Sequence, residues 1–463
     1  MNTRDIIACG IPNVSRILDA AKHAAKAARL KKGPLRAALK ALGAAPENYA
    51  QDPVFGELAQ AILQARSARE LYRERAVPAA YARWGQDLDP AALVQMEQAC
   101  RLPISVAGAL LPDAHVGYGL PIGGVLATTN AVIPYAVGVD IACRMKLTVL
   151  DLPISALVEQ QDRLVVALEA ETRFGVGATF SNKRRHAIMD ANWNVAPILA
   201  RLKDKAWAQL GTSGSGNHFV EYGALTLAAD DLGLAAGVYL ALLSHSGSRG
   251  AGNEIASFYS RLAMSQHPEL PRELLRLAWF DLDSADGQEY WQAMELMGRY
   301  AAANHELIHQ RLAAHLGAEI LLDVENHHNF AWIEEHAGQR VVVHRKGATP
   351  AMTGTLGVIP GSMASPGYVV RGKGNPASLH SASHGAGRRM SRSEAKNSFT
   401  WRQLELVLAE RGVTLLAAGL DEAPMSYKDI ESVMAAQSDL VDIVARFDPK
   451  LVKMARGNER PED

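Results

Sequence analysis

The sequence predicts an α+β fold, in which one large domain of mixed sheets and helices over residues 86–463 follows a helical segment over residues 1–85. From Ala107 onward, short runs of β-forming residues are separated by Gly, Pro, Asn and Ser. Helical patterns interrupt these runs without regular alternation, which argues against a doubly wound parallel sheet. Residues 107–463 contain no repeat and no linker-like stretch, so we expect them to fold as one unit.

The first 85 residues combine helical periodicity with positive charge. They contain 14 Lys and Arg residues against 7 Asp and Glu residues, whereas the whole chain has a net charge of −1. Apolar residues recur at helical spacing at Val14, Ile17, Leu18 and Ala21. We expect this first helix to end at Lys32-Gly33-Pro34, because glycine and proline commonly follow a helix.

Further helices and strands follow from the periodicity of the apolar residues. A second helix is expected over residues 35–42, closed by Gly43, and a third contains Leu58, Ile62 and Leu71. Four runs are expected to form strands: Met145–Leu150, Gly237–Leu243, Ile320–Val324 and Gln339–His344. Five segments of the large domain are expected to form helices: about 156–170, 253–265, 289–316, 401–411 and 426–446.

The composition is that of an ordinary globular protein and excludes several classes. No apolar stretch approaches the roughly 20 residues that cross a bilayer, and Ile6–Gly10 is too short for the core of a signal peptide. The three cysteines make no disulfide framework, so we expect a reducing cytoplasm, where Cys143 stays available to a metal. A chain this neutral can attract nucleic acid only through a local basic patch.

A candidate metal site begins at Gly138–Cys143, where Asp140 and Cys143 lie three residues apart after a strand-like run. Histidines beside small or polar residues follow at the ends of apolar runs: His218, His245, His327, His328 and His384. A thiolate can bridge two cations, a carboxylate can hold the harder one, and neutral imidazoles can complete both sets of ligands. Because side chains alternate in extended chain, only one histidine of the adjacent pair should face the site.

Three segments are candidates for contacts with phosphate groups. The Gly- and Ser-rich run Gly211–Phe219 is either an anion-binding loop with exposed backbone N–H groups or a tight turn. Arg249 follows His245 closely enough to meet a phosphate oxygen in bidentate fashion. His344–Thr349 is either a second cationic cluster at a strand end or a solvated charged turn.

His384 is the candidate nucleophile. It lies in Ser383–Gly387, among small residues that leave its ring accessible, and Arg388 and Arg389 follow at once. A histidine in such surroundings suits attack on a phosphoryl group, and the alternative is a turn histidine without a chemical role.

Together these segments resemble the RtcB family of GTP-dependent RNA ligases. The resemblance extends in the family's order over about 105–457 and does not include the N-terminal segment. The segments that carry it are Pro112–Gly117, Val137–Cys143, Gly214–Phe219, His245–Gly250, His344–Thr349, Pro360–Met363 and His384–Gly387.

The resemblance implies an RtcB-like catalytic domain that holds two Mn²⁺ ions. Cys143 would bridge them, with His218 and His245 on one ion and Asp140 and His328 on the other. Thiolate and imidazole ligands favour Zn²⁺ over Mn²⁺ on raw affinity, so the manganese assignment rests on the resemblance alone.

The resemblance also implies a reaction that passes through a histidine. His384 would take GMP from GTP and transfer it to an RNA 3′-phosphate, and a 5′-hydroxyl end would displace the GMP. A 2′,3′-cyclic phosphate end would first be opened at the metal site. The residues expected around the nucleotide are Asn217, His218, Phe219, Val220, Glu221, His328, Asn329, Pro360, Gly361, Ser362, Met363, Gly367, His384, Gly385, Ala386, Gly387 and Arg456.

The chain departs from the family's pattern at several positions. Gly367 stands where the family has a nucleotide-contacting serine, unless Ser365 substitutes for it. Arg456 replaces a guanine-contacting lysine, and Ala142 and Arg144 flank the cysteine where small polar or glycine residues are usual. These departures suggest a divergent branch that acts in RNA repair rather than tRNA splicing. An activating protein is a further candidate partner.

The residues also allow other functions for the large domain and two roles for the N-terminal segment. A dinuclear-metal cyclic phosphodiesterase would need the metal residues but not His384, and an RNA-binding module without chemistry would have lost the metal residues. The N-terminal segment is either a helical cap with a solvated basic face or a lid that faces RNA. We expect residues 1–85, with Lys31, Lys32 and Arg36 among their cations, to hold RNA through phosphate contacts and to take no part in guanylylation.

Overall fold

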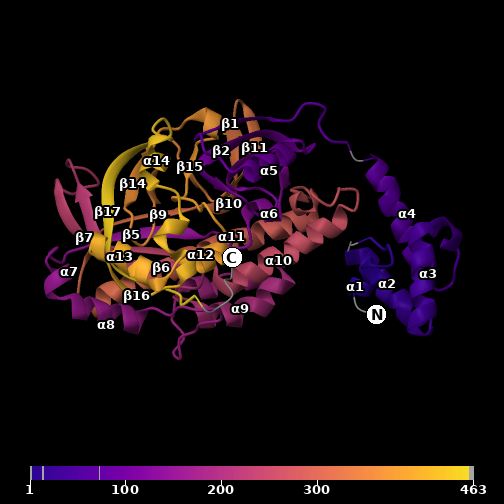
Figure 1. Ribbon diagram of the computed structural model, residues 1–463, viewed down its shortest axis with the longest axis horizontal. Helices are drawn as coiled ribbons and strands as arrows, with labels where there is room; N and C mark the ends of the chain where they lie inside the picture. Colours follow the sequence, from indigo (N-terminus) through magenta and orange to yellow (C-terminus); the bar gives the residue numbers. More distant parts are fainter. Residues whose placement is uncertain (1–2, 13–14, 72, 458–463) are drawn as a thin grey trace.

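The computed structural model describes residues 3–12, 15–71 and 73–457. Figure 1 shows a large body of sheets and helices with a small group of helices standing at one end. We call this group, residues 3–71, the N-terminal lobe, and residues 80–457 the body. The mixture of sheets and helices confirms the predicted α+β class.

The N-terminal lobe consists of α1 (Thr3–Ile7), α2 (Ser15–Ala27), α3 (Lys32–Ala44) and α4 (Gly56–Leu71). Its helices bury their own apolar faces against one another, so the lobe has a separate small core. The core residues include Ile17, Leu18, Ala21, Leu35, Leu39, Leu42, Leu58 and Ile62.

Two helix boundaries predicted for this segment are wrong. Lys32-Gly33-Pro34 begins α3 instead of ending the preceding helix, because proline fits the first turn, where its missing N–H is not needed. Gly43 lies within the last turn of α3, which ends at Ala44. Val14 lies outside the described residues.

Two large sheets form the centre of the body, and most of their strand pairs are antiparallel. The five-stranded sheet contains, in spatial order, β1 (Ala80–Arg83), β2 (Ser105–His115), β3 (Ile122–Thr128), β11 (Gln339–Lys346) and β10 (Asn329–His336). The eight-stranded sheet contains, in spatial order, β13 (Leu356–Ile359), β14 (Gly367–Gly372), β17 (Val441–Met454), β6 (Phe219–Leu227), β7 (Gly237–Ser246), β5 (Arg144–Leu150) and β9 (Ile320–His327), with β16 (Thr414–Ala417) beside β17. Two small ribbons pair β12 (Ala348–Pro350) with β15 (Ser381–Ser383) and β4 (Ala131–Val132) with β8 (Phe280–Asp281).

Helices pack around these sheets. The longest, α11 (Ala285–His315), contacts β5 and β7, and its His309 bonds to Thr148 and Ser244 of those strands. The other helices of the body are α5 (Pro90–Cys100), α6 (Pro134–Val137), α7 (Ala156–Glu159), α8 (Gln161–Glu171), α9 (Pro197–Gln209), α10 (Arg249–Gln266), α12 (Arg392–Ser398), α13 (Trp401–Arg411) and α14 (Ile430–Ala435). Among the described residues, no helix combines the length and the apolarity needed to span a membrane.

The four predicted strands are all present, and two of them, Gly237–Ser246 and Ile320–His327, extend further toward the candidate histidines than predicted. The helix predicted over 426–446 is wrong in its second half. Only Ile430–Ala435 is helical, and Val441–Met454 forms β17, which pairs with β6 and β14. The predicted helix over 156–170 is divided at Gln160 into α7 and α8.

Candidate active site

Adjacent strands of the eight-stranded sheet bring the candidate metal ligands together. The strands β6, β7, β5 and β9 are neighbours in that order. His218 directly precedes β6, Cys143 directly precedes β5, and His328 directly follows β9. His245 lies near the end of β7, between β6 and β5. Residues that are far apart in the sequence therefore meet at one edge of the sheet.

The ligand atoms converge in two groups that share the Cys143 sulfur. One group contains Asp140, Cys143 and His218, and the other contains Cys143, His245 and His328, with the ligand atoms of each group within 4.8 Å of one another. The sulfur lies 3.0 Å from His245 Nε2 and 3.4 Å from His218 Nε2. His218 Nε2 lies 3.1 Å from Asp140 Oδ2, and the Nε2 atoms of His245 and His328 are 3.2 Å apart.

The five candidate metal ligands lie together, but their grouping differs from the one that the resemblance implied. The resemblance implied that His218 and His245 share one ion and that Asp140 and His328 share the other. The structure instead places Asp140 beside His218, and His245 beside His328. The turn between Asp140 and Cys143 brings the carboxylate to the β6 side of the sulfur, and sequence order alone does not specify this.

The chemistry of these donors fits divalent metals. Burial lowers the pKa of His245 to about 3 and that of His328 well below its usual value, so both rings are neutral, as metal ligands must be. Burial alone would raise the pKa of Asp140, but the hydrogen bond and charge of His218 lower it to about 2. The Asn217 carbonyl accepts a hydrogen bond from His245 Nδ1 at 3.2 Å, which leaves Nε2 free to face the sulfur.

Two residues of the segment after His245 support this site from behind. A Cβ at Gly247 would collide with the carboxylate of Asp140, so only glycine allows this close approach. Arg249 is buried and donates to His218 Nδ1 at 3.2 Å. The cavity wall does not include it, so the structure does not support the predicted contact between Arg249 and phosphate.

The side chain of His384 is fixed by Asp113. His384 Nδ1 lies 2.6 Å from Asp113 Oδ2, and the same oxygen accepts the His384 backbone N–H at 3.1 Å. Burial alone would raise the pKa of Asp113, but the hydrogen bond and charge of His384 hold it below its usual value. The carboxylate therefore accepts a hydrogen bond from Nδ1–H, and the lone pair of Nε2 stays available.

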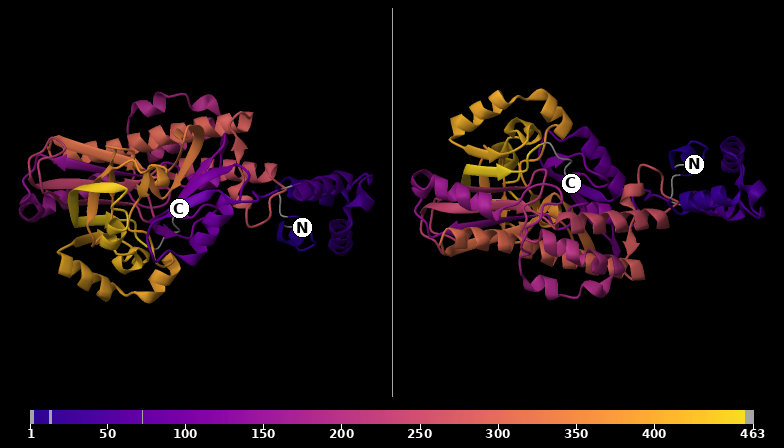
Figure 2. Two further views of the ribbon diagram at one scale, coloured as in Figure 1. Left: turned by 90° about the horizontal axis from the view of Figure 1, so that it is seen from above. Right: turned by 90° about the horizontal axis from the view of Figure 1, so that it is seen from below.

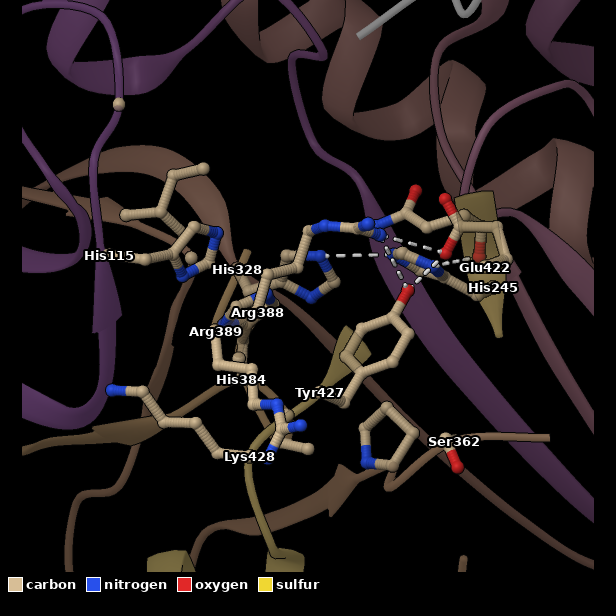
Figure 3. A pocket seen from close by; sticks show the side chains of 18 of the residues that line it. His115, His245, His328, Ser362, His384, Arg388, Arg389, Glu422, Tyr427 and Lys428 are labelled. Atoms are coloured by element: carbon tan, nitrogen blue, oxygen red, sulfur yellow. Dashed lines mark hydrogen bonds and ion pairs between the residues drawn. The ribbon is translucent and has the colours of Figure 1, made fainter. Parts of the chain in front are cut away.

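The small residues after His384 are required by close packing. Gly387 has a φ of +74°, and a Cβ there would collide with the backbone carbonyl of Asp113. Lys428 Nζ donates to the carbonyls of Pro112 and Ala114 at 2.9 and 2.8 Å, and so fixes the backbone on both sides of Asp113. Figure 3 shows Lys428 and His115 on the same side of the cavity as His384.

A cavity of about 1230 Å³ opens over both centres and is lined by residues from both large sheets. The His328 and His384 rings lie 5.0 Å apart at its wall, so the metal groups and the candidate nucleophile face one space. The predicted nucleotide residues on this wall are Asn217, Phe219, Glu221, His328, Asn329, Pro360, Gly361, Ser362, Met363, Gly367, His384, Gly385, Ala386 and Gly387.

Three predicted nucleotide residues do not line this cavity. His218 is buried behind Asp140 and Cys143. Val220 points into the core beneath the sheet, because Phe219 and Glu221 occupy the opposite face of β6. Arg456 is exposed and lines a separate cavity of about 780 Å³ beside α13.

Hydroxyl groups remain on the wall despite the departure at Gly367. Ser365 lines the cavity, and its Oγ lies 2.8 Å from Ser362 Oγ. Ser365 therefore places a hydroxyl group on the wall, where it can substitute for the serine that the family has at the position of Gly367. Asn329 connects two loops of the site, because its Oδ1 accepts from Gly347 N at 2.8 Å and its Nδ2 donates to the Asp140 carbonyl at 3.3 Å.

Some cations near the site are held by partners within the protein, and others are exposed. Arg345 is fully buried and forms a bidentate ion pair with Glu334, so the alternative of a solvated charged turn is wrong for it. Arg388 donates to the Asp421 carbonyl at 2.7 Å and to Glu422 and Tyr427, whereas Arg389 is exposed on the cavity wall (Figure 3).

The sequence motifs do not reveal all of these residues. Asp113 lies in the recognised segment Pro112–Gly117, but nothing local indicates that it bonds to a histidine 271 residues away. Lys428 and Tyr427 lie in no recognised segment. The signal that could have found Asp113 is a carboxylate beside a histidine in a run of otherwise apolar and small residues.

Comparison with known proteins agrees with the motifs. The model of a family described as tRNA-splicing ligase RtcB matches residues 95–454. The RNA-splicing ligase RtcB of Escherichia coli K12 is 34% identical over 364 residues, which cover 73% of this chain and 87% of that protein. The tRNA-splicing ligase RtcB of Nanoarchaeum equitans is 32% identical over 437 residues, covering 78% of this chain and 91% of that protein. The RNA-splicing ligase RtcB of Mycobacterium bovis is 33% identical over 431 residues, which cover 77% of this chain and 99% of that protein.

The matched range begins after the N-terminal lobe and includes every candidate metal ligand, Asp113 and His384. The geometry of the site and these similarities lead to one conclusion: the chain belongs to the RtcB family of RNA ligases.

Proposed function

We propose that this protein is a GTP-dependent ligase that joins RNA 3′-phosphate or 2′,3′-cyclic phosphate ends to 5′-hydroxyl ends through GMP carried on His384. The observation that supports this most strongly is the Asp113–His384 pair at the wall of the cavity, beside the two ligand groups. The cytoplasm is its proposed compartment, and RNA repair or tRNA splicing its role.

His384 has the geometry of a nucleophile. With Nδ1 bonded to Asp113, the Nε2 lone pair attacks the α-phosphorus of GTP. The N–P bond forms as the bond to the bridging oxygen breaks, and pyrophosphate leaves with the electron pair. The ring becomes positive during attack, and the buried carboxylate of Asp113 stabilises that charge.

Transfer to RNA reverses this role. The RNA 3′-phosphate displaces His384 from the GMP phosphorus, and the 5′-hydroxyl then attacks the activated 3′-phosphate and releases GMP. Arg389 is exposed on the cavity wall, where it can contact the phosphates of an incoming strand. Arg388, fixed by Glu422 and Tyr427, keeps its charge oriented beside the same wall (Figure 3).

Two divalent cations would be held by the ligand groups, one by Asp140, Cys143 and His218 and the other by Cys143, His245 and His328. When bound, they supply positive charge that neutralises phosphate oxygens and lowers the pKa of an attacking hydroxyl or water. We propose manganese for both ions from the family resemblance.

Glu221 is the proposed guanine-reading residue. Glu221 lines the cavity and is almost fully buried, and no hydrogen bond joins its side chain to the described residues. Burial raises the pKa of Glu221 well above its usual value, so the group is short of a partner. The edge of guanine offers adjacent N–H donors to a carboxylate, whereas the same edge of adenine offers none at the ring nitrogen.

The experiment is incubation of the pure protein with GTP labelled at the α-phosphate and Mn²⁺, without RNA. We expect label on the protein that is lost in acid, as a histidine phosphoramidate is, and no label on His384→Ala. The cyclic phosphodiesterase alternative predicts hydrolysis of 2′,3′-cyclic phosphate ends without any labelled protein. Label that persists on His384→Ala would contradict the proposed nucleophile.

A further inference from the structure

The N-terminal lobe differs in charge from the body to which it is attached. The first 85 residues carry an excess of seven positive charges, so residues 86–463 have 34 Lys and Arg residues against 42 Asp and Glu residues. A body with this net negative charge repels a polyanion at long range. The family match begins only at residue 95, so it does not account for the lobe.

The positive charge of the lobe is concentrated on the hairpin of α2 and α3. Residues 15–45 contain Asp19 as their single acidic residue. The exposed cations of the hairpin are Lys22, Lys26, Arg29, Lys31, Lys32, Arg36 and Lys40. In α3, Lys32, Arg36 and Lys40 follow at intervals of four, which aligns them along one side of the helix at steps of about 6 Å.

The apolar sides of the same helices are not available to a partner. Leu35, Leu39 and Leu42 of α3 and Ile17 and Leu18 of α2 are buried in the lobe's own core. A helix that binds a membrane surface inserts its apolar face, and these helices have none exposed. Leu30, in the turn between the two helices, is the one large apolar residue that the described hairpin exposes. The hairpin therefore offers a cluster of charges with little apolar surface, which suits a phosphate backbone.

The position of the lobe argues against the cap interpretation. Figures 1 and 2 show it projecting beyond the end of the body, where it does not cover a face of either sheet. It contacts the body through α2 and α10. Because α10 begins at Arg249, beside His218, and has 18 residues, the lobe lies within roughly 27 Å of the metal ligands along this helix.

We infer that the exposed cations of α2 and α3 bind the phosphates of the RNA substrate while its end occupies the catalytic cavity. This inference rests on the proposed function, because it takes the ligand to be the RNA that the body joins. A span of about 27 Å corresponds to roughly eight nucleotides of a stacked strand. An RNA with its end in the cavity therefore gains affinity from the lobe when it is at least about this long, whereas an RNA of a few nucleotides does not reach from the cavity to the lobe.

The test uses the full chain with Lys26→Gln, Lys31→Gln and Lys40→Gln combined. These three cations make no ion pair with any described residue, whereas Lys32 and Arg36 both approach Asp5, so their removal would also disturb the lobe. The matched control, Arg201→Gln, Arg340→Gln and Arg402→Gln, removes the same charge from exposed positions of the body. The melting temperature of each variant checks its fold.

Binding is measured directly, as a function of salt, with single-stranded oligouridylates of about 20 and about 4 nucleotides. For the longer RNA, we expect the lobe variant to raise Kd about tenfold at low salt and to reduce the slope of log K against log salt by about 2, while the body control changes neither. For the shorter RNA, we expect all three proteins to be alike.

Several results would overturn the inference. These are an unchanged affinity and slope in the lobe variant, an equal loss in the body control, or an equal loss for both RNA lengths. Binding of the wild-type chain to phosphatidylserine vesicles, lost in the lobe variant while RNA binding persists, would assign the surface to membranes instead. The binding measurement requires no ligation, so its result does not depend on the proposed chemistry. If the proposed chemistry is wrong, the labelling experiment with GTP will show no guanylylation, whereas the RNA affinities will be unaffected.

Discussion

The body and the N-terminal lobe differ in how their residues relate to function. The body contains every candidate catalytic group, most of them buried, and each is held by partners from distant parts of the chain. The lobe lies outside the family match and carries its charges on exposed helices, and none of its described residues lines the cavity.

The difference indicates that catalytic groups must be fixed in position, whereas groups that hold the substrate by charge need not be. Buried donors act through fixed positions, so single substitutions in the body should have large effects. Exposed cations act through summed charge, so single substitutions in the lobe should have small and salt-dependent effects.

Replacing His384 by alanine is expected to have the largest effect. Guanylylation and ligation should fall below detection, because no other described histidine combines an Asp partner with a place beside His328 on the wall. Metal content should stay near wild type, which elemental analysis can check. The protein should still fold, with a modestly lower melting temperature because the buried Asp113 loses its imidazole partner. Loss of the metals in this variant would show that the two centres are not separable as described.

Replacing Cys143 by alanine should remove both metal ions, because its sulfur is the one ligand that the two groups share. His245→Ala is the sharper comparison, since it weakens only the group that contains His328 and should leave one ion. Elemental analysis of the two variants decides this, and two tightly held ions in Cys143→Ala would contradict a bridging sulfur. Zn²⁺ added to the protein loaded with Mn²⁺ should inhibit guanylylation, because thiolate and imidazole ligands favour zinc.

Asp113→Asn should slow guanylylation by roughly 10²- to 10⁴-fold, because the amide cannot stabilise a positive ring as the carboxylate does. The folded-state pKa of Asp113 is below its usual value, so its charge stabilises the fold above the ordinary Asp pKa. This contribution is lost as the pH falls through the lowered pKa. The Tm difference between wild type and variant should therefore shrink in acid, and a constant difference would contradict the lowered pKa of Asp113 in the folded protein.

The smallest expected effects in the body concern recognition of guanine. Glu221→Gln should raise KM for GTP about tenfold, because an amide places a donor where the base also donates. Arg456→Ala should change the same KM by less than about twofold, since Arg456 lines a different cavity. Steady-state guanylylation kinetics measure both. A larger effect at Arg456 than at Glu221 would mean that the C-terminal segment moves onto the nucleotide.

The sequence predicts much of the fold where signals are local. The helix over 401–411 has the predicted ends because Thr400 and Gln403 form a capping box at its start. The strand Val441–Met454 could not be predicted in this way, because its short apolar alternation becomes a strand only through pairing with β6 and β14.

The candidate site shows the same limit. The metal residues could be chosen by residue type, but their division into two groups depends on which strand ends are neighbours. The position of Val220 depends on strand register, and the role of Asp113 depends on a contact across 271 residues. The location of Arg456 depends on how the C-terminal segment packs beside α13.

Localisation of the guanylate on the intact chain tests directly whether His384 is the nucleophile. The full-length protein is incubated with GTP and Mn²⁺ in the absence of RNA, digested under mildly alkaline conditions that preserve a phosphoramidate, and examined by mass spectrometry. We expect one GMP adduct, on the peptide that contains His384, and its disappearance when RNA with a 3′-phosphate is added. An adduct on any other residue, or an adduct on His384 that RNA does not discharge, would contradict this expectation.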